Sequence, residues 1–386
     1  MSSRRTQTTE KAMFIFMLLL FILASSYIFI RGWQALPAML SIRVIYTTLF
    51  VFLTFGYILA FVFRKSLPLW FTNFVSVVGP TWMIAILYLF MAVVIIDLLR
   101  VANHWLHFFP SWITANYAKT KLVTFFSVIG VIGVIFLWGY YKFTHPTINR
   151  VEVRVHKPAM GDKKELRIVM ASDLHLGNII GKGRLTKFVE LINSQNPDII
   201  LFSGDIMDGD IRPVIAKHMD EELRQLNAPL GVYGVLGNHE YIGGDVEGAV
   251  SYLQKANVRI LKDEVLDIGN SLTLVGRDDR MNSSRKSLHE LTDSLNKGRT
   301  IILLDHQPYH LEEAEECEVD LMLSGHTHKG QIWPISCFVS RMYEVAQGYK
   351  QKGNTHVYVS AGLGLWGPPF RIGTESELLV ATLVFD

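Results

Sequence analysis

The chain has 386 residues, which is long enough for two domains that each bury a core. Half of the residues are hydrophobic and the formal net charge is only +2, which excludes the strongly basic composition of a nucleic-acid-binding protein. Two cysteines, Cys317 and Cys337, exclude a zinc ribbon and allow at most one disulfide, and we expect both to be unpaired. Residues 1–150 hold 12 Lys+Arg and two acids, whereas the remainder holds 25 Lys+Arg and 33 Asp+Glu. This asymmetry predicts a basic membrane half and an acidic soluble half.

Four apolar runs near the N-terminus have the length that a bilayer demands, about 20 residues each. They are residues 12–30, 42–63, 74–99 and 122–141. The first lies where a signal peptide would lie, but its apolar core is too long and three more runs follow. We therefore expect residues 1–145 to form a four-helix transmembrane region of a multi-pass protein, with the lipid bilayer as its partner.

The positions of the cations predict the orientation of these spans. One side of the membrane would carry eight cations: Arg4, Arg5, Lys11, Arg64, Lys65, Lys142, Arg150 and Arg154. The other side would carry five: Arg31, Arg43, Arg100, Lys119 and Lys121. Because loops rich in Lys and Arg stay in the cytoplasm, we expect the C-terminal domain to be cytoplasmic, at the inner membrane of a bacterial cell.

From residue 146 onward, short apolar segments alternate with polar turns. We expect strands at 151–155, 166–171, 198–202, 232–236, 301–304 and 319–323, and a helix at 184–194. The spacing predicts a domain of alternating strands and helices over residues 146–386.

Five of these strands end in a turn that contains residues able to bind metal. The turns are Asp173-Leu174-His175, Gly204-Asp205 with Asp208, Gly237-Asn238-His239-Glu240, Asp305-His306 and Gly325-His326-Thr327-His328. Ligands at strand ends converge on one edge of a sheet, where glycines allow tight turns. Carboxylates bridge two cations, imidazoles suit transition metals, and an amide oxygen completes a shell without adding charge. A single His-x-His pair would be weak evidence, but five such turns in succession predict a metal centre.

These motifs, in this order, resemble those of the calcineurin-like metallophosphoesterases over residues 166–386. The resemblance is closer to the membrane-anchored bacterial branch, through Gly330-Gln331, 360–364 (Ser-Ala-Gly-Leu-Gly) and Pro369-Phe370-Arg371. It implies an α/β domain of two mixed β-sheets packed face to face, with helices outside. Known members of related branches cleave phosphodiesters, or the pyrophosphate of UDP-diacylglucosamine.

The resemblance also implies roles for individual residues. One metal ion would be held by Asp173, His175 and His328, and a second by Asn238, His306 and His326. Asp205 would bridge the two. His239 would lie near the leaving-group oxygen, with Asp208 orienting it. Glu240 stands where many relatives have aspartate, which changes no ligand. The nitrogen and oxygen ligands accept Mn, Fe, Zn or Co without selecting one.

The expected function is hydrolysis of a phosphodiester or pyrophosphate by a membrane-bound enzyme with two divalent metal ions. About 30 residues separate the last span from Asp173, which favours a lipid-linked or membrane-surface substrate. Two alternatives remain open. The enzyme would be a tethered hydrolase of soluble phosphodiesters or nucleotides, or the C-terminal domain would be an inactive sensor of a phosphorylated ligand.

Two groups outside the motifs have both a substrate-binding and a purely structural interpretation. Lys182 and Arg184 would either meet a phosphate near the metals or belong to a solvated loop and helix start. Trp333 and Trp366, with residues 368–370, would either form an apolar rim around the site or pack inside the domain.

Overall fold

The computed structural model describes residues 2–62, 68–159, 161 and 163–385. The chain divides into two compact units, an N-terminal unit of Met1–Leu137 and a C-terminal unit of Trp138–Asp386. These units are defined only by how compactly their residues pack. They do not test the domain boundary predicted after residue 145, which stays a prediction. Each unit is described by itself below.

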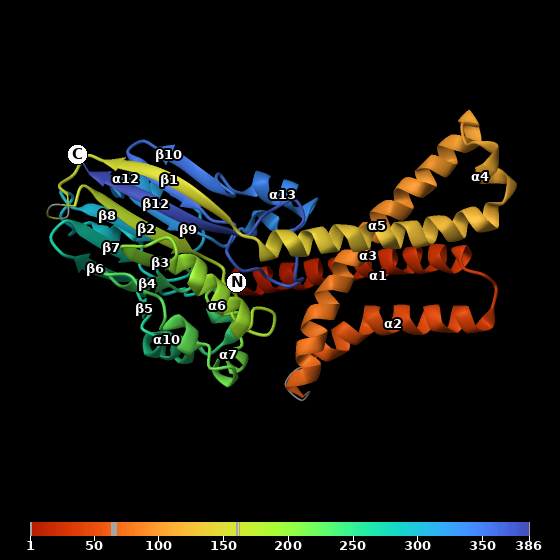
Figure 1. Ribbon diagram of the computed structural model, residues 1–386, viewed down its shortest axis with the longest axis horizontal. Coiled ribbons are helices and arrows are strands. Elements are labelled where there is room, and N and C mark those ends of the chain that lie inside the picture. Colours follow the sequence, from red (N-terminus) through yellow and green to blue (C-terminus); the bar gives the residue numbers. More distant parts are fainter. Residues whose placement is uncertain (1, 63–67, 160, 162, 386) are drawn as a thin grey trace. The chain divides into compact units, whose positions relative to one another are not determined.

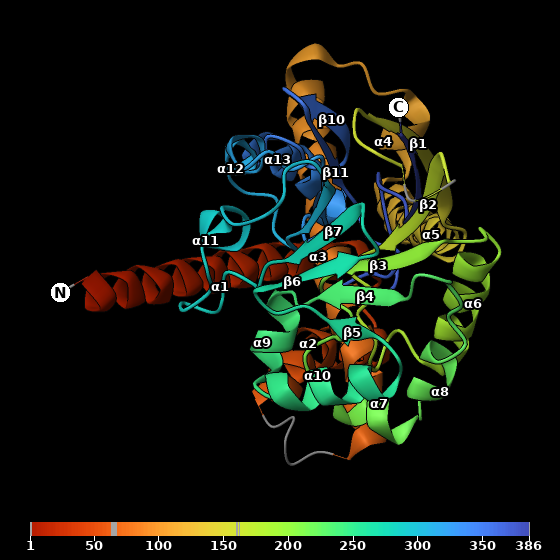
Figure 2. The ribbon, with the colours of Figure 1, turned by 90° about the vertical axis from the view of Figure 1, so that its left-hand side faces the viewer.

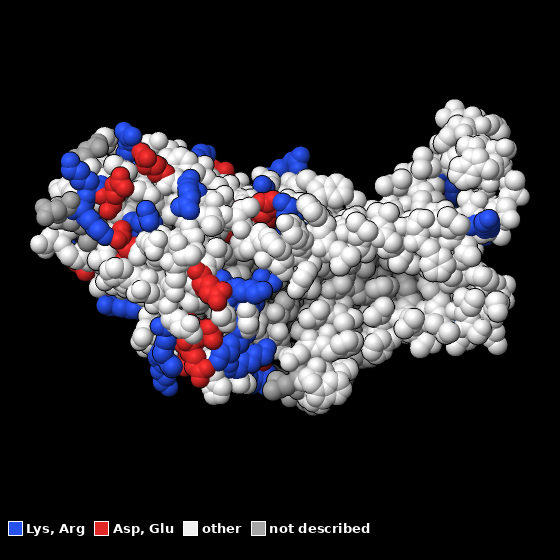
Figure 3. Space-filling view, viewed as in Figure 1, with Lys and Arg blue, Asp and Glu red and all other residues white. Residues whose placement is uncertain are grey.

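The N-terminal unit consists of helices in the part of it that the structure describes (Figure 1). They are α1 (Ser2–Ala35), α2 (Leu40–Val62), α3 (Leu69–Leu106), α4 (Ser111–Ala115) and the greater part of α5 (Tyr117–Thr144). Among the described residues, three segments are long and apolar enough to cross a membrane: Ile15–Ala35, Trp70–Leu106 and Tyr117–Thr144. In the face seen in Figure 3, charged side chains cover the C-terminal unit and are sparse on these helices.

Of the four predicted spans, three fall in helices that are long and apolar enough to cross a membrane, and the crossing itself stays a prediction. The predicted run 42–63 falls in α2, in which Leu40–Gly56 is an apolar segment shorter than a full span. Residue 63 lies outside the described residues.

The C-terminal unit contains two six-stranded sheets, and both are mixed, as predicted. In spatial order the first is β1 (Thr147–Val155), β12 (Glu377–Phe385), β2 (Glu165–Ala171), β3 (Ile199–Ser203), β4 (Val232–Val235) and β5 (Arg259–Ile260). The second is β10 (Gly348–Lys352), β11 (Thr355–Val359), β9 (Leu321–Ser324), β8 (Thr300–Leu304), β7 (Leu272–Gly276) and β6 (Glu264–Ile268). Strands β2, β3 and β4 are parallel neighbours, and so are β7, β8 and β9.

Alternating side chains along the strands build a four-layer sandwich. Ile168 and Met170 of β2 pack between the two sheets, together with Ile302 and Leu304 of β8. Their neighbours point the other way, because successive residues of a strand face opposite sides. Val169 therefore packs beneath the helices that cover the first sheet, and the outer face of the second sheet has its own covering helices.

The helices of the C-terminal unit fall into three groups (Figure 2). The first sheet is covered by α6 (Lys182–Asn193), α7 (Arg212–Ala216), α8 (Asp220–Leu223) and α10 (Val246–Lys255). The second sheet is covered by α11 (Leu288–Thr292) and α12 (Leu311–Glu316). Short helices α9 (Asn238–Gly243), η1 (His328–Gly330) and α13 (Ile335–Met342) follow strand ends. Both cysteines are free, as predicted.

The last two turns of α5 belong to the C-terminal unit. Phe143 is buried in the core beneath the first sheet, and Arg184 stacks over its ring at 4.9 Å. Arg371 donates its backbone N–H to the carbonyl of Gly139 at 3.0 Å. The end of this helix is therefore anchored by core packing as well as by the chain connection to β1.

Candidate metal centre

The site lies where parallel strands of both sheets end. Asp173 and His175 follow β2, Asp205 follows β3, and Asn238 begins α9 just beyond β4. The second sheet contributes His306 after β8, and His326 and His328 after β9. Because parallel strands deliver their carboxyl ends to one edge, two sheets packed face to face bring all five turns together. The structure thus gathers every residue that the sequence predicted for the site.

Five of these side chains are carried by backbone in the left-handed region. The φ angles are 52° at Asp173, 50° at His175, 49° at Asp205, 71° at His326 and 47° at His328. Such conformations cost about 1–3 kcal/mol each and concentrate at functional sites. Hydrogen bonds between the turns hold them, including Asp173 N–H to Gly204 O and His175 N–H to Asp205 O, both at 3.0 Å.

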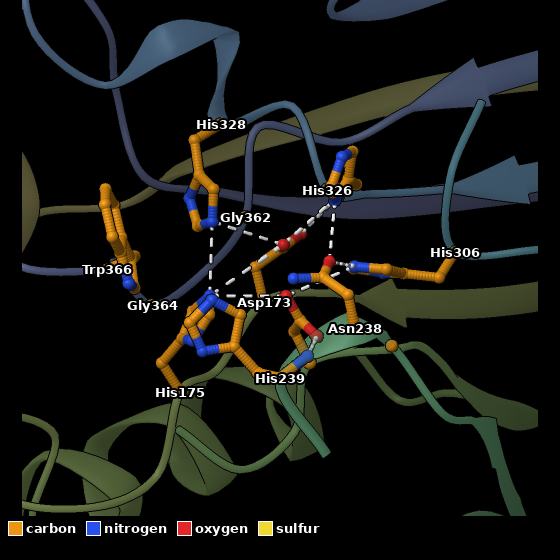
Figure 4. A network of polar contacts seen from close by, with 12 residues as sticks. Asp173, His175, Asn238, His239, His306, His326, His328, Gly362, Gly364 and Trp366 are labelled. Atoms are coloured by element: carbon orange, nitrogen blue, oxygen red, sulfur yellow. Dashed lines mark hydrogen bonds and ion pairs between the residues drawn. The ribbon is translucent and has the colours of Figure 1, made fainter. Parts of the chain in front are cut away.

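The first group of donor atoms consists of Asp173, His175 and His328 (Figure 4). The Nε2 atoms of His175 and His328 face each other at 3.1 Å. Nε2 of His328 lies 3.3 Å from Oδ1 of Asp173. Two imidazole nitrogens pointed at one another beside a carboxylate present lone pairs to a common point, which suits a cation.

The second group consists of Asn238, His306 and His326, on the other side of Asp173 in Figure 4. Oδ1 of Asn238 lies 2.8 Å from Nδ1 of His326 and 3.3 Å from Nε2 of His306. Nδ1 of His306 is 2.7 Å from the carbonyl of Ser203. That carbonyl accepts the Nδ1 proton and leaves Nε2 as the free donor atom, a common device behind metal-binding histidines.

Asp205 lies between the two groups. Its Oδ2 is 3.2 Å from Nε2 of His306 and 3.8 Å from Nε2 of His175. Its Oδ1 accepts the backbone N–H of His239 at 2.8 Å, which fixes the carboxylate. Asp205 is therefore placed to share one oxygen between the two groups of donors.

The electrostatics of the site call for cations. Burial raises the pKa of the Asp173 carboxyl, and the neighbouring Asp205 adds to the effect. Burial also opposes ionisation of Asp205, but its interactions with His306, His175 and His239 together outweigh burial and lower the pKa of that carboxyl. Burial lowers the pKa of His326 to about 3, which keeps its imidazole neutral and able to act as a ligand. The donor set of imidazoles, carboxylates and one amide oxygen therefore fits divalent transition metals.

Asp208 contacts two histidines instead of one. Its Oδ1 lies 3.1 Å from Nδ1 of His239, as the predicted orienting role requires, and 3.3 Å from Nδ1 of His175. Burial opposes ionisation of Asp208, but its contacts with these two histidines lower its pKa. His175, Asp208 and His239 are also close enough to form a third possible metal-binding group.

Glu240 links two of the site's loops. It accepts the N–H of Gly237 at 2.7 Å and the N–H of Met207 at 2.8 Å. Burial, with the charge of Asp205, raises the pKa of this carboxyl to about 7. Both of these hydrogen bonds go to backbone N–H groups, which agrees with the inference that the aspartate-to-glutamate difference changes no ligand.

Arg371 is a site-supporting residue whose role the sequence did not reveal. It is fully buried, and its Nη2 donates to the carbonyls of Ala361 at 2.7 Å and Gly364 at 2.6 Å. The same atom is 3.5 Å from Nδ1 of His328. Gly364 in turn donates its N–H to the carbonyl of Asp173 at 3.1 Å. Arg371 therefore holds the loop after β11 against two residues of the first donor group.

The remaining candidates divide between the two interpretations. Lys182 pairs with Glu221 and Arg184 stacks on Phe143, so their contacts are structural. Trp366 is 55% exposed and its ring lies 6.3 Å from that of His239, whereas Phe370 is buried. Trp366 thus fits the predicted apolar rim, Trp333 is 45% exposed, and Phe370 packs inside the unit.

Comparisons with known proteins agree with this geometry. Residues 166–330 match the model of a family described as calcineurin-like phosphoesterase. A metallophosphoesterase of Aquifex aeolicus is 32% identical over 256 residues, which cover 64% of this chain and 96% of the relative.

The chain belongs to the calcineurin-like metallophosphoesterase family. It is therefore a metal-dependent phosphoester hydrolase, and members of this family are dinuclear metal enzymes.

Relatives of this phosphoesterase occur in animals as well as bacteria. A metallophosphoesterase of Caenorhabditis elegans is 30% identical over 333 residues, covering 81% of this chain and 68% of the relative. A transmembrane protein with a metallophosphoesterase domain from Bos taurus is 32% identical over 262 residues, covering 60% of this chain and 56% of that protein. Among solved structures, an NAD nucleotidase of Haemophilus influenzae aligns with a TM-score of 0.36 and 15% identity. That alignment covers 52% of this chain and 46% of the nucleotidase.

We predict that Gly325→Ala lowers the metal content of the phosphoesterase. A Cβ atom at Gly325 would lie 2.3 Å from Oδ2 of Asp173, so the carboxylate must move. Elemental analysis after dialysis measures the effect. Gly183→Ala in α6 is the matched control, because a Cβ atom there meets nothing within 4 Å. Equal metal content in both variants would show that metal binding does not depend on this position of Asp173.

Proposed function

We propose that this chain is a multi-pass membrane phosphoesterase that hydrolyses a phosphodiester or pyrophosphate with two divalent metal ions. The observation that carries the proposal is the position of Asp205 Oδ2 between two groups of donor atoms, 3.2 Å from His306 and 3.8 Å from His175. One ion would be held by Asp173, His175 and His328, and the other by Asn238, His306 and His326, with Asp205 shared. When bound, such ions lower the pKa of water and offset the negative charge of a phosphate.

His239 is proposed to assist the leaving group. Its Nδ1 is held 3.1 Å from the carboxylate of Asp208, which fixes the ring and stabilises its protonated form. With Nδ1 engaged, Nε2 is the atom that would give a proton or hydrogen bond to the departing oxygen. The side chain of His239 is 15% exposed, compared with 0% for His175 and His306, which agrees with contact to substrate.

We predict that His239→Ala and Asp205→Ala fail in different ways. His239→Ala should keep its metal ions and lose about 10²–10⁴-fold in rate, mainly in kcat, because a positioned acid is lost. The loss should shrink for nitrophenyl esters, whose leaving groups need less protonation. Asp205→Ala should bind at least one ion much more weakly, because the shared carboxylate is gone.

Elemental analysis and kinetics on both variants test these roles. Loss of a metal ion from His239→Ala, or an equal slowing of good and poor leaving groups, would assign His239 to metal or phosphate binding instead.

A lipid-linked or membrane-surface substrate is supported by an apolar surface beside the site. Helix α13 begins seven residues after His328 and exposes Ile335, Phe338 and Met342. Trp366 is also exposed, and its carbonyl accepts a side-chain N–H of Gln331, which lies between η1 and α13, at 2.7 Å. Clusters of exposed apolar side chains often mark binding sites for apolar partners or membranes. The substrate class proposed is a lipid phosphodiester or a lipid-linked pyrophosphate.

We predict that Phe338→Ser raises KM for a lipid phosphodiester presented in vesicles and leaves KM for a soluble nitrophenyl phosphodiester unchanged. Ile215→Ser in α7 removes a similarly exposed apolar side chain from another face and is the control. Faster turnover of soluble nucleotides than of any lipid phosphoester by wild-type protein would favour the tethered hydrolase of soluble substrates.

The proposed localisation is an inner membrane crossed by α1, α2, α3 and α5, with the C-terminal unit in the cytoplasm. The eight-to-five division of cations supports this orientation. We predict that a reporter fused after Asp386 is active when it requires the cytoplasm and inactive when it requires export. The reverse result would overturn the orientation and leave the chemistry untouched.

A further inference from the structure

The N-terminal unit contains a cavity of about 540 Å³ that the phosphoesterase reaction does not use. Residues from α1, α2, α3 and α5 line it, and most of their side chains are apolar. Ile28, Phe50, Leu89, Phe125 and Ile132 are among them. The volume of this cavity is within the range of ordinary ligand-binding pockets. Because its lining is mostly apolar, the cavity can hold an acyl chain.

Positive charge is concentrated at one end of this cavity. Arg31 lies near the end of α1, Arg100 near the end of α3, and Lys121 near the start of α5. Asp97 is the one acid among the lining residues that the structure describes. Three cations and one acid leave this end of the cavity with a net charge of +2.

The three cations at this end of the cavity have only one carboxylate, that of Asp97, to balance their charge. Asp97 pairs with Arg31 at 2.5 Å and with Arg100 at 3.1 Å, so one carboxylate is shared by two guanidinium groups. Lys121 donates to the carbonyl of Gln34 at 2.9 Å and lies over the ring of Tyr117 at 5.6 Å, and it forms no ion pair with a carboxylate of the described residues. Nε of Arg31 is buried with no hydrogen-bond partner among the described residues.

Ionisable groups are expensive within a bilayer and normally have a partner there. An apolar cavity with cations at its end is complementary to an anionic amphiphile, because the acyl chain meets the apolar lining and the phosphate meets the cations. We propose that this cavity binds a phospholipid of net negative charge, with an acyl chain among the helices and its phosphate at Arg31, Arg100 and Lys121. The proposal rests on the proposed insertion of these helices in a bilayer.

This site is distinct from the catalytic one. Lys121 lies in the second turn of α5, whereas the opposite end of that helix, Thr144, leads into β1 of the C-terminal unit. The bound lipid would therefore be a resident of the membrane unit, while substrate would be met at the ends of β2, β3, β4, β8 and β9.

Native mass spectrometry of the full-length protein in detergent tests the proposal, with phosphatidylglycerol and phosphatidylcholine of identical acyl chains as probes. We expect phosphatidylglycerol to bind more tightly. Lys121→Gln should weaken that binding about fivefold, since a cation near lipid phosphates contributes about 1 kcal/mol. Adding Arg100→Gln should weaken it further. Inorganic phosphate alone should not compete, because it lacks the acyl chain.

Lys119→Gln is the matched control. It removes the same charge two residues before Lys121, and the side chain of Lys119 does not line the cavity. It should leave the affinity unchanged. Val93→Phe, which fills the cavity without changing charge, should weaken binding of phosphatidylglycerol as well. Equal affinity for the two lipids, or equal losses in Lys119→Gln and Lys121→Gln, would overturn the proposal. Extraction of the full chain from membranes by alkaline carbonate would instead refute the membrane insertion on which it rests.

Discussion

The structure of the site depends on two buried carboxylates and five imidazoles that share one small volume. Asp173 and Asp205 are each at most 2% exposed, and burying such charges without compensation costs several kcal/mol per ion. The hydrogen bonds of the buried Arg371 go to the carbonyls of Ala361 and Gly364, so it makes no direct pair with either carboxylate. Metal ions satisfy the constraint, and the donor atoms already converge as such ions require.

The packing of the two sheets brings these carboxylates and imidazoles together. Three parallel strands of each sheet end at the same edge, so turns far apart in sequence become neighbours. The turns accept left-handed backbone at five predicted ligands, a cost that the surrounding hydrogen bonds offset. Gly237 and Gly325 are required there, because a Cβ atom at either would strike the carboxylate of Asp205 or Asp173.

Sequence reasoning recovered the parts of the molecule that are encoded locally. Each ligand turn directly follows an apolar strand, so β2, β3, β4, β8 and β9 could be placed, and the helical spacing of Leu185, Phe188 and Ile192 placed α6. The insertion of β12 between β1 and β2 could not be predicted, because it pairs Thr147 with Glu377 across most of the C-terminal unit. Arg371 belongs to a motif that carried the resemblance, but its supporting role could not be predicted, because only the tertiary structure shows that it is buried. The contact of Asp208 with His175 likewise depends on how two loops meet.

Anomalous diffraction from crystals of the metal-reconstituted protein would show whether Asp205 is shared by two metal ions. We expect two anomalous peaks per chain, one beside Asp173, His175 and His328 and the other beside Asn238, His306 and His326, with Asp205 in contact with both. A single peak, or a peak between Asp208 and His239, would contradict it.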